Sequence, residues 1–151
     1  MDNRRFERAS KEARVEELKE SARRLREFDQ FANFSDQDLR RIVEAAHRTS
    51  TSGPWPLIRE GTPSDACYIL LSGEAAVYVG HDRIAVVGSG EVIGESALLR
   101  GRLRNATVAT TGRAEVLHID RNDLDRLLDE IPALRKLIDV TVARHAPQAA
   151  D

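Results

Sequence analysis

Glycines divide the middle of this 151-residue chain into short segments, and their spacing restricts the fold more than any other feature. All nine glycines lie between Gly53 and Gly112, and between them come the short apolar runs CYILL, EAAVYV, RIAVV, ATVAT and AEVLHI. Short strands separated by turn residues at regular intervals indicate a sandwich or barrel rather than alternating strand–helix units. We therefore predict an α+β fold, an antiparallel β-roll or jelly-roll barrel flanked by N-terminal and C-terminal helices.

The N-terminal region has a different pattern. Residues 3–46 contain neither Gly nor Pro and are rich in Glu, Arg, Ala and Leu, a composition that favours helices. One helix is predicted over about 3–27, and a second, capped by Ser35, over about 36–47. The first helix carries an apolar stripe at 3-4-3 spacing, formed by Val15, Leu18, Ala22 and Leu25.

Two more helices are predicted after the strands. The first is capped by Asp120 and carries Leu124, Leu127 and Leu128 on one face. The second begins at Pro132, since proline is tolerated at the first helical position, and we expect it to fray after Arg144. We divide the chain into an N-terminal helix and connector (1–34), the main domain (35–145) and a flexible tail (146–151).

Charge and cysteine content exclude several classes of protein. The net charge of −2 comes from 25 acidic and 23 basic residues, which gives no reason to expect nucleic acid as a partner. The single Cys67 cannot form an internal disulfide, which suits a reducing compartment. We find no signal peptide and no apolar run close to the roughly 18–20 residues of a membrane span. We expect a cytoplasmic protein with no membrane partner.

Residues 94–108, GESALLRGRLRNATV, carry the most informative chemistry. A single helical turn over about 96–99 presents backbone N–H groups that favour an anion. Arg104 comes just before an alternating strand, where a guanidinium without a partner is costly and a phosphate suits its donors. Glu95 would repel a polyphosphate but tolerate one phosphodiester charge, and it could accept a hydrogen bond from a sugar hydroxyl. A 3′,5′-cyclic nucleotide has these two features together.

The same stretch resembles the phosphate-binding cassette of cyclic-nucleotide-binding domains, in which Phe-Gly-Glu-Leu-Ala-Leu precedes Pro-Arg-Ala-Ala-Thr-Val. Here the two motifs read IGESAL at 93–98 and LRNATV at 103–108, with the family's usual spacing. The resemblance implies that Glu95 binds the ribose 2′-hydroxyl and Arg104 binds the cyclic phosphate. It places the ligand site at Gly94, Glu95, Ser96, Ala97, Leu98, Arg104, Asn105 and Ala106.

An upstream segment supports the resemblance. IREGTPSDACYILLSGEAAVY is similar to the family's Ile-x-x-Glu-Gly-x-x-x-Asp-x-x-Tyr-Ile-Leu-x-x-Gly pattern, which expects turns at Gly61 and Gly73. It places Asp65 where the family can pair an acid with the phosphate arginine, and a plain salt bridge to Asp65 is the alternative role for Arg104. The cassette departs from the family at Leu103, where proline is usual, so its loop is less rigid.

The C-terminal helices contain no aromatic residue, because all seven lie at or before Tyr78. Any lid that these helices form over the base must therefore be aliphatic or guanidinium; the alternatives are a base covered from elsewhere, for example by Trp55, or left open. The candidates are Leu134, Arg135, Leu137 and Ile138. Asn105 stands where guanine-selective members often carry Thr or Ser, so we expect cAMP to be preferred over cGMP.

We therefore predict a cyclic-nucleotide sensor, without enzymatic activity, cofactor or metal, that couples ligand binding to movement of its flanking helices. The alternative is a structural module that binds no ligand and docks on a protein partner, or on a second copy, through its N-terminal helix. A metal-dependent enzyme on a similar barrel is disfavoured because the histidines are scattered along the sequence. They are His47, His81, His118 and His145.

Overall fold

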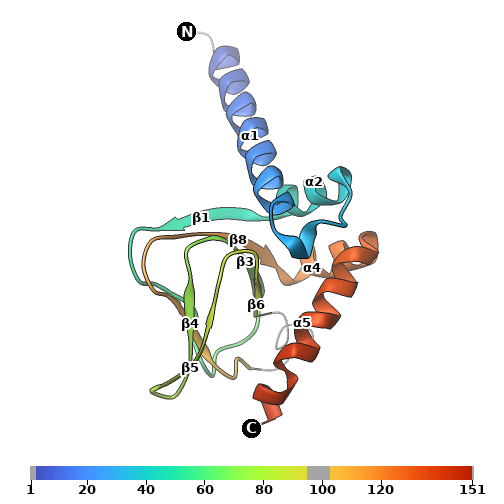
Figure 1. The fold of residues 1–151 in the computed structure, drawn as a ribbon. Helices are drawn as coiled ribbons and strands as arrows, with labels where there is room; N and C mark the ends of the chain where they lie inside the picture. The colour runs from blue at the N-terminus through green and yellow to red at the C-terminus, as the bar shows by residue number, and fades with distance from the viewer. Residues whose placement is uncertain (1–2, 95–102, 151) are drawn as a thin grey trace.

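The computed structural model describes residues 3–94 and 103–150, with side chains described from Arg4 to Thr141. Eight strands in this part of the chain form two four-stranded antiparallel sheets that face each other, and helices precede and follow the strands in the sequence (Figure 1). One sheet has the order β1-β8-β3-β6 and comprises His47–Thr51, Ala114–Asp120, Ala66–Ser72 and Val92–Ile93. The other has the order β2-β7-β4-β5 and comprises Pro56–Ile58, Thr107–Thr110, Ala75–Val79 and Asp82–Val87. The predicted fold class is confirmed.

The five predicted apolar runs form β3, β4, β5, β7 and β8, whereas β1, β2 and β6 were not predicted. The β1 sequence is HRTST, which is polar because it forms the edge of its sheet and pairs only with β8 among the described strands. β2 and β6 are three and two residues long. Segments this short carry no readable alternation, so tertiary pairing alone defines them.

Two turn glycines confirm the pattern in the sequence. Gly61 and Gly73 have φ of +81° and +87°, in the left-handed region that favours glycine. At Gly73 a Cβ would lie 2.6 Å from the backbone oxygen of Arg113. The β3–β4 turn therefore requires glycine for its conformation and for its close contact with the start of β8.

The apolar side chains form two cores. The larger core lies between the helices and one face of the β3–β8 sheet, and Cys67, Ile69 and Leu71 enter it from β3. The smaller core lies between the two sheets and includes Leu70 and Val116. Alternation along β3 thus divides its side chains between the cores, and Cys67 is a buried, small apolar group as expected.

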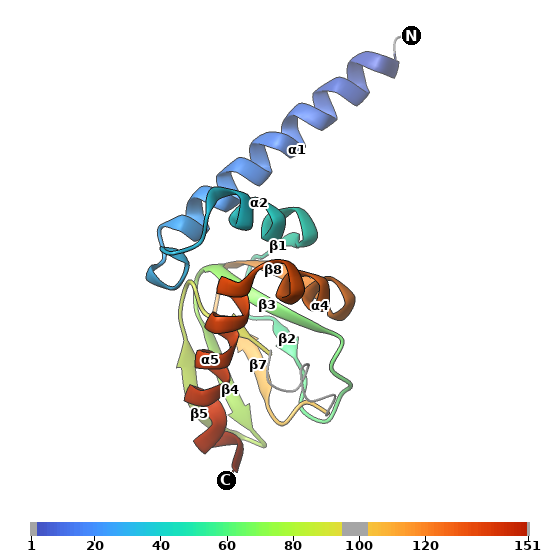
Figure 2. The same ribbon diagram turned by 90° about the vertical axis from the view of Figure 1, so that its right-hand side faces the viewer.

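Helix α1 (Asn3–Arg26) is the feature that departs most from a compact domain. Its C-terminal part packs on the roll, where Leu25 is fully buried and Leu18 and Ala22 are partly buried. Its N-terminal part extends away from the sheets (Figures 1 and 2), and Val15 is 47% exposed. A 3₁₀ turn, η1 (Asp29–Phe31), and helix α2 (Asp36–Ala45) follow, and Ser35 Oγ accepts a 3.0 Å hydrogen bond from Asp38 N as predicted.

A charged network holds α1 against the outer face of β1 and β8. Glu115 of β8 accepts hydrogen bonds from Arg48 of β1 at 2.5 Å and from Arg24 of α1 at 3.1 Å. Arg48 also contacts Glu20 at 3.3 Å. The Arg48 hydrogen bond, joined by that of Arg24, holds the pKa of the Glu115 carboxyl below its usual value. Four charges on three elements therefore set the direction in which α1 leaves the roll.

The C-terminal helices are α4 (Arg121–Glu130) and α5 (Pro132–Ala150). Asp120 occupies the predicted cap position of α4, but its side chain makes no capping hydrogen bond. Helix α5 continues past Arg144, where we predicted that it frays, to Ala150. Its last turns are rich in alanine, the strongest helix former, and the single Pro147 does not end them. Within the described residues, no helix has the length and apolar character needed to cross a membrane.

Candidate functional site

The predicted ligand site falls at the connection between β6 and β7. The structure describes its two ends, Gly94 after β6 and Leu103 to Ala106 before β7. Glu95, Ser96, Ala97 and Leu98 lie outside the described residues, and their predicted roles remain predictions. The geometry of the site therefore rests on Gly94, Arg104 and the segments that contact them.

Gly94 packs directly against the arginine expected to bind phosphate. Its φ is +85°, and an added Cβ would lie 2.8 Å from both Arg104 Nη1 and Ile58 Cδ1. A side chain at this position would have to displace the guanidinium or the end of β2. Glycine is thus required here because it adopts the positive φ and because it has no Cβ to collide with the Arg104 guanidinium.

The Arg104 side chain is 6% exposed, which is rare for a residue of its type. Its Nη1 donates a 2.6 Å hydrogen bond to the carbonyl oxygen of Gly94, and its Nη2 donates to the carbonyl oxygen of Ala66 at the start of β3. These two bonds fix the plane of the guanidinium between β3 and the end of β6. A planar group held in this way can present its donors to a phosphate in a defined direction.

The backbone of Arg104 is held by the loop between β2 and β3. Arg104 N donates to the carbonyl oxygen of Thr62 at 2.9 Å, and its own carbonyl accepts from Gly61 N at 2.8 Å. This pair of bonds has the pattern of a short antiparallel ladder. The upstream motif and the cassette, which are far apart in the sequence, therefore meet at Arg104.

Asp65 and Tyr68 lie in the same neighbourhood. Burial raises the pKa of the Tyr68 phenol, the charge of Asp65 raises it further, and the charge of Arg104 lowers it. The Asp65 side chain is exposed, and the hydrogen bonds described for the Arg104 guanidinium go to carbonyl oxygens. The predicted pairing of Asp65 with Arg104 stays a prediction.

Sequence reasoning missed a contact that joins this loop to the C-terminal helices. Arg121, the first residue of α4, donates from Nη2 to the Ser64 carbonyl oxygen at 2.9 Å, and its backbone N donates to the Asp65 carbonyl oxygen at 3.0 Å. A basic residue in the first turn of a helix is unfavourable to the helix dipole. That mismatch was the available signal that Arg121 has a role outside its own helix.

The four lid candidates on α5 separate into two groups. Leu134 and Ile138 are buried in the core between the helices and the sheet, so in this conformation they face the protein interior. Arg135 is exposed and Leu137 is partly buried at the edge of that core. Helical periodicity could not separate the two groups, because an apolar residue on a helix suits a protein core and a ligand equally well.

The histidines are not all scattered in space. His47 of β1 lies opposite His118 of β8, with ring centroids 6.1 Å apart, and the Tyr68 ring packs edge-on against His118 at 5.2 Å. Sequence distance concealed this proximity because antiparallel pairing joins the two strands. Even so, the described residues contain no group of three or more potential metal ligands.

Comparison with known proteins decides the family. A sequence model of the cyclic nucleotide-binding domain matches residues 56–131, from the start of β2 to the residue after α4. The chain belongs to the cyclic nucleotide-binding domain family. This match includes Gly94 and Arg104, so the buried arginine described above lies within the region that is characteristic of the domain.

Relatives of this cyclic nucleotide-binding domain occur in protein kinases. A cAMP-dependent protein kinase regulatory subunit from Hypocrea atroviridis is 36% identical over 78 residues, covering 52% of this chain and 17% of the relative. A cGMP-dependent protein kinase from Toxoplasma gondii is 37% identical over 76 residues, covering 50% of this chain and 8% of the kinase. The chain therefore corresponds to a small part of each relative.

Solved structures with the same fold agree with this assignment. The regulatory domain of Toxoplasma gondii PKA with cAMP superposes with a TM-score of 0.75 at 18% identity, covering 90% of this chain and 52% of that one. A cyclic nucleotide-binding-like protein from Brucella abortus has a TM-score of 0.59 at 28% identity, covering 73% of this chain and 98% of that one. The arrangement of sheets and helices is thus that of the cyclic nucleotide-binding domain.

Proposed function

We propose that this domain is a regulatory module that binds a 3′,5′-cyclic nucleotide, with cAMP preferred over cGMP. The observation that carries the proposal is Arg104, a buried guanidinium held against Gly94 at the connection where the family binds its ligand. A cyclic phosphate carries one negative charge and suits the bidentate geometry of arginine. Burial strengthens the attraction because the local dielectric is low.

The remaining contacts of the proposed site follow from the cassette motif. Glu95 accepts a hydrogen bond from the ribose 2′-hydroxyl, and backbone amides near Ala97, Leu98 and Asn105 complete a nest for the phosphate. Ser96 and Ala106 flank these groups. A binding role without catalysis is favoured because the family match is to the ligand-binding domain. The activities named in the kinase relatives belong to proteins of which this chain covers 17% or less.

A route from the ligand to the C-terminal helices is part of the proposal. Thr62 and Gly61 bind the backbone of Arg104, and two residues further along the same loop the Ser64 and Asp65 carbonyls bind Arg121 at the start of α4. A shift of Arg104 toward a phosphate therefore pulls on a loop that is bonded directly to α4. If the ligand binds more tightly when the loop is in one of two positions, binding favours that position of the loop and of the helices attached to it.

Ligand binding should stabilise the fold. At about a hundred times its dissociation constant, cAMP is expected to add about 2.7 kcal/mol to the free energy of unfolding. Thermal unfolding of the purified chain with and without cAMP, cGMP and 5′-AMP measures the effect, and 5′-AMP serves as a control that lacks the cyclic phosphodiester. A melting temperature that does not move in millimolar cAMP or cGMP would support the alternative of a module that binds no ligand.

We expect Asn105 to determine whether the site prefers adenine or guanine. Its side chain is exposed beside Arg104, and in a loop Asn tends to bond to nearby backbone, which leaves the guanine 2-amino group without a partner. A buried donor without a partner costs about 1–3 kcal/mol, so cAMP should bind about tenfold or more tightly than cGMP. Competition titrations test this preference. The Asn105→Thr variant should show a smaller difference in affinity between cAMP and cGMP. Equal or tighter cGMP binding that is lost in Asn105→Ala would mean that Asn105 itself recognises guanine.

The coupling route makes a separate prediction about Arg121. Arg121→Ala removes the Nη2 bond to Ser64 and keeps the backbone bond to Asp65. We expect cAMP affinity to change little, while the ligand-induced change in hydrogen exchange of α4 decreases. Arg126→Ala is the matched control, because Arg126 is exposed and bonds only to Asp123 on its own helix among the described contacts. An α4 response equal to wild type in Arg121→Ala would exclude this route.

A further inference from the structure

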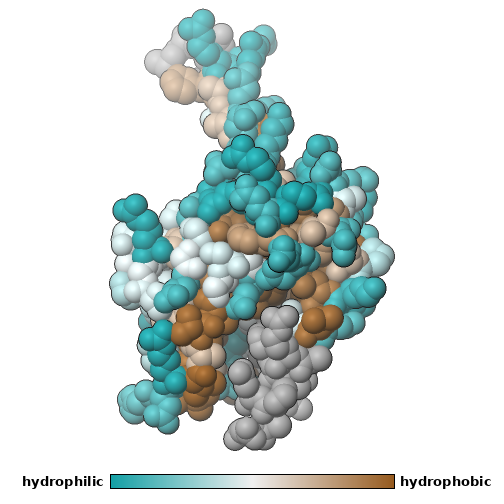
Figure 3. Space-filling model, in the orientation of Figure 1, coloured by the Kyte–Doolittle hydropathy of each residue, from teal (hydrophilic) through white to brown (hydrophobic). Residues whose placement is uncertain are grey.

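The N-terminal part of α1 is a long helical segment without support from the rest of the domain. Every side chain from Arg4 to Glu17 is exposed, and Figures 1 and 3 show the segment standing clear of the sheets. An isolated helix of about 12–15 residues is only marginally stable in water. Packing adds nothing to the stability of this segment, so a partner surface would stabilise it as a helix.

One face of the segment has the spacing of a helix-pairing seam. Phe6, Ala9 and Ala13 recur at three and four residues, and Glu16 and Glu20 continue the same face toward the roll. Phe6 is 73% exposed, the most exposed large apolar side chain among the described residues. The small alanines beside it would allow a second helix to approach closely.

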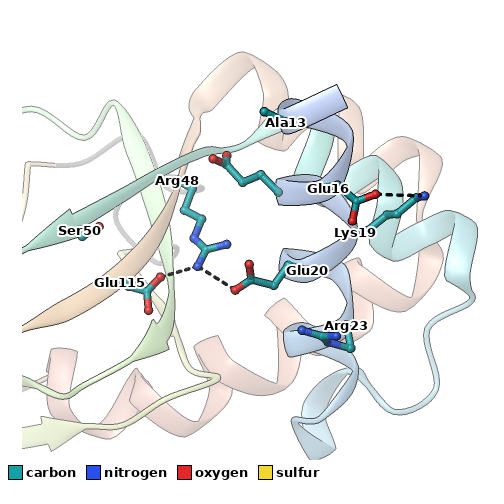
Figure 4. A pocket seen from close by; sticks show the side chains of 9 residues that line it. Ala13, Glu16, Lys19, Glu20, Arg23, Arg48, Ser50 and Glu115 are labelled. Carbon is teal, nitrogen blue, oxygen red and sulfur yellow. Dashed lines mark hydrogen bonds and ion pairs between the residues drawn. The ribbon is translucent and has the colours of Figure 1, made fainter. Parts of the chain in front are cut away.

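This face leads into a groove between α1 and β1 (Figure 4). The groove has a volume of about 810 Å³ and is open to solvent along α1. Arg48 and Glu115 form its floor with their ion pair, and Glu16 and Glu20 form its helical wall. Its lining has four acidic and three basic side chains, and ion pairs with Lys19 and Arg48 already engage three of the acids. The groove therefore has a small acidic excess, which favours a basic helix over an acidic one.

The charge pattern of the projecting part of α1 is complementary to that of a second α1 helix that runs in the opposite direction. In residues 4–14 the basic residues are Arg4, Arg5, Arg8, Lys11 and Arg14, against the acidic Glu7 and Glu12. In residues 15–20 the acidic residues are Glu16, Glu17 and Glu20, against Lys19 alone. Residues 21–26, which add Arg23, Arg24 and Arg26, belong to the part of α1 that packs on the roll. Two such helices placed antiparallel along residues 4–20 bring the basic segment 4–14 of each toward the acidic segment 15–20 of the other. A parallel pair would instead place like charges together.

We propose that two copies of this chain pair through antiparallel α1 helices, with Phe6 and the basic segment 4–14 of one helix in the α1–β1 groove of the other. The contact is two-fold symmetric, as in most homodimers. Because α1 points away from the sheets, antiparallel pairing places the two rolls at opposite ends of the seam (Figure 2). The contact uses no residue of the ligand site and is independent of the proposed function.

The first test measures mass against concentration. Light scattering coupled to gel filtration should show a mass rising from 16.8 kDa toward twice that value between micromolar and near-millimolar protein, because a seam of a few turns lies at the small end of stable interfaces. Phe6→Asp should keep the single-chain mass throughout. Val15→Asp adds the same charge on the opposite face of the same helix and should associate like wild type. A single-chain mass for wild type at every concentration, or equal disruption by both variants, overturns the proposal.

The second test uses charge reversal. Arg5→Glu with Arg8→Glu makes the projecting part of α1, residues 4–20, net acidic, and Glu16→Arg with Glu17→Arg makes it net basic, without altering Arg48 or Glu115. Each double variant should remain a single chain, and an equal mixture should form a heterodimer that weakens in high salt. Circular dichroism of each variant checks that the roll is folded. A mixture that does not associate overturns the antiparallel pairing.

Discussion

Replacing Arg104 by alanine is expected to weaken cyclic nucleotide binding by about 2–5 kcal/mol, the cost of removing one partner of a buried charged contact. At about 1.4 kcal/mol per factor of ten, this is a loss of about 30-fold to several thousand-fold in affinity. The large effect follows from geometry. Arg104 is 6% exposed, and the carbonyls of Gly94 and Ala66 hold its guanidinium, so the direction of this group is already set when the phosphate arrives.

Isothermal titration with cAMP measures this loss, and two variants make it specific. Arg104→Lys retains the charge but not the planar fork, so it should recover only part of the affinity. Arg59→Ala removes an exposed arginine from the neighbouring loop and should leave the affinity close to wild type, which separates direct contact from general electrostatics. Unliganded unfolding in urea shows whether each variant is folded. Wild-type affinity in a folded Arg104→Ala protein would make Arg104 a purely structural residue.

Replacing Gly94 by alanine should impair both stability and binding. The left-handed backbone at φ +85° costs a residue with a Cβ roughly 1–3 kcal/mol. The new Cβ would also lie 2.8 Å from Arg104 Nη1 and from Ile58 Cδ1, so the guanidinium must move away from its hydrogen bond to the Gly94 carbonyl. We therefore expect cAMP affinity to fall by about tenfold or more. This corresponds to about 1.4 kcal/mol of binding free energy, lost because Arg104 is no longer held in position.

Gly80→Ala separates the two causes. Gly80 has φ +60°, and an added Cβ there would have nothing within 4 Å, so this variant introduces a similar backbone strain without displacing Arg104. Its free energy of unfolding should fall while its affinity for cAMP stays close to wild type. Equal losses of affinity in Gly80→Ala and Gly94→Ala would mean that strain, and not displacement of Arg104, weakens binding.

Much of the fold could be predicted because its signals are local. The apolar runs between glycines correspond to five strands, and the turns at Gly61 and Gly73 have the positive φ that their positions required. The helix after Ser35 begins with the predicted capping bond. These features depend on residues close together in the sequence, where backbone conformation and alternation act directly. Strand β1 could not be predicted because a polar edge strand is defined by its partner β8 and not by its own composition.

For the site, the sequence predicted Arg104, because a guanidinium before an alternating strand is costly without a partner, and it predicted Gly94 through the resemblance of residues 93–98 to the family's cassette. Only the tertiary structure decided what holds Arg104 in place, namely the carbonyls of Gly94 and Ala66 and the loop at Thr62. It also placed Leu134 and Ile138 in the core and Arg121 against the loop. The physical reason is that residue type and spacing determine local conformation and chemical capacity, whereas the partner of a buried group depends on which distant strands and helices pack beside it.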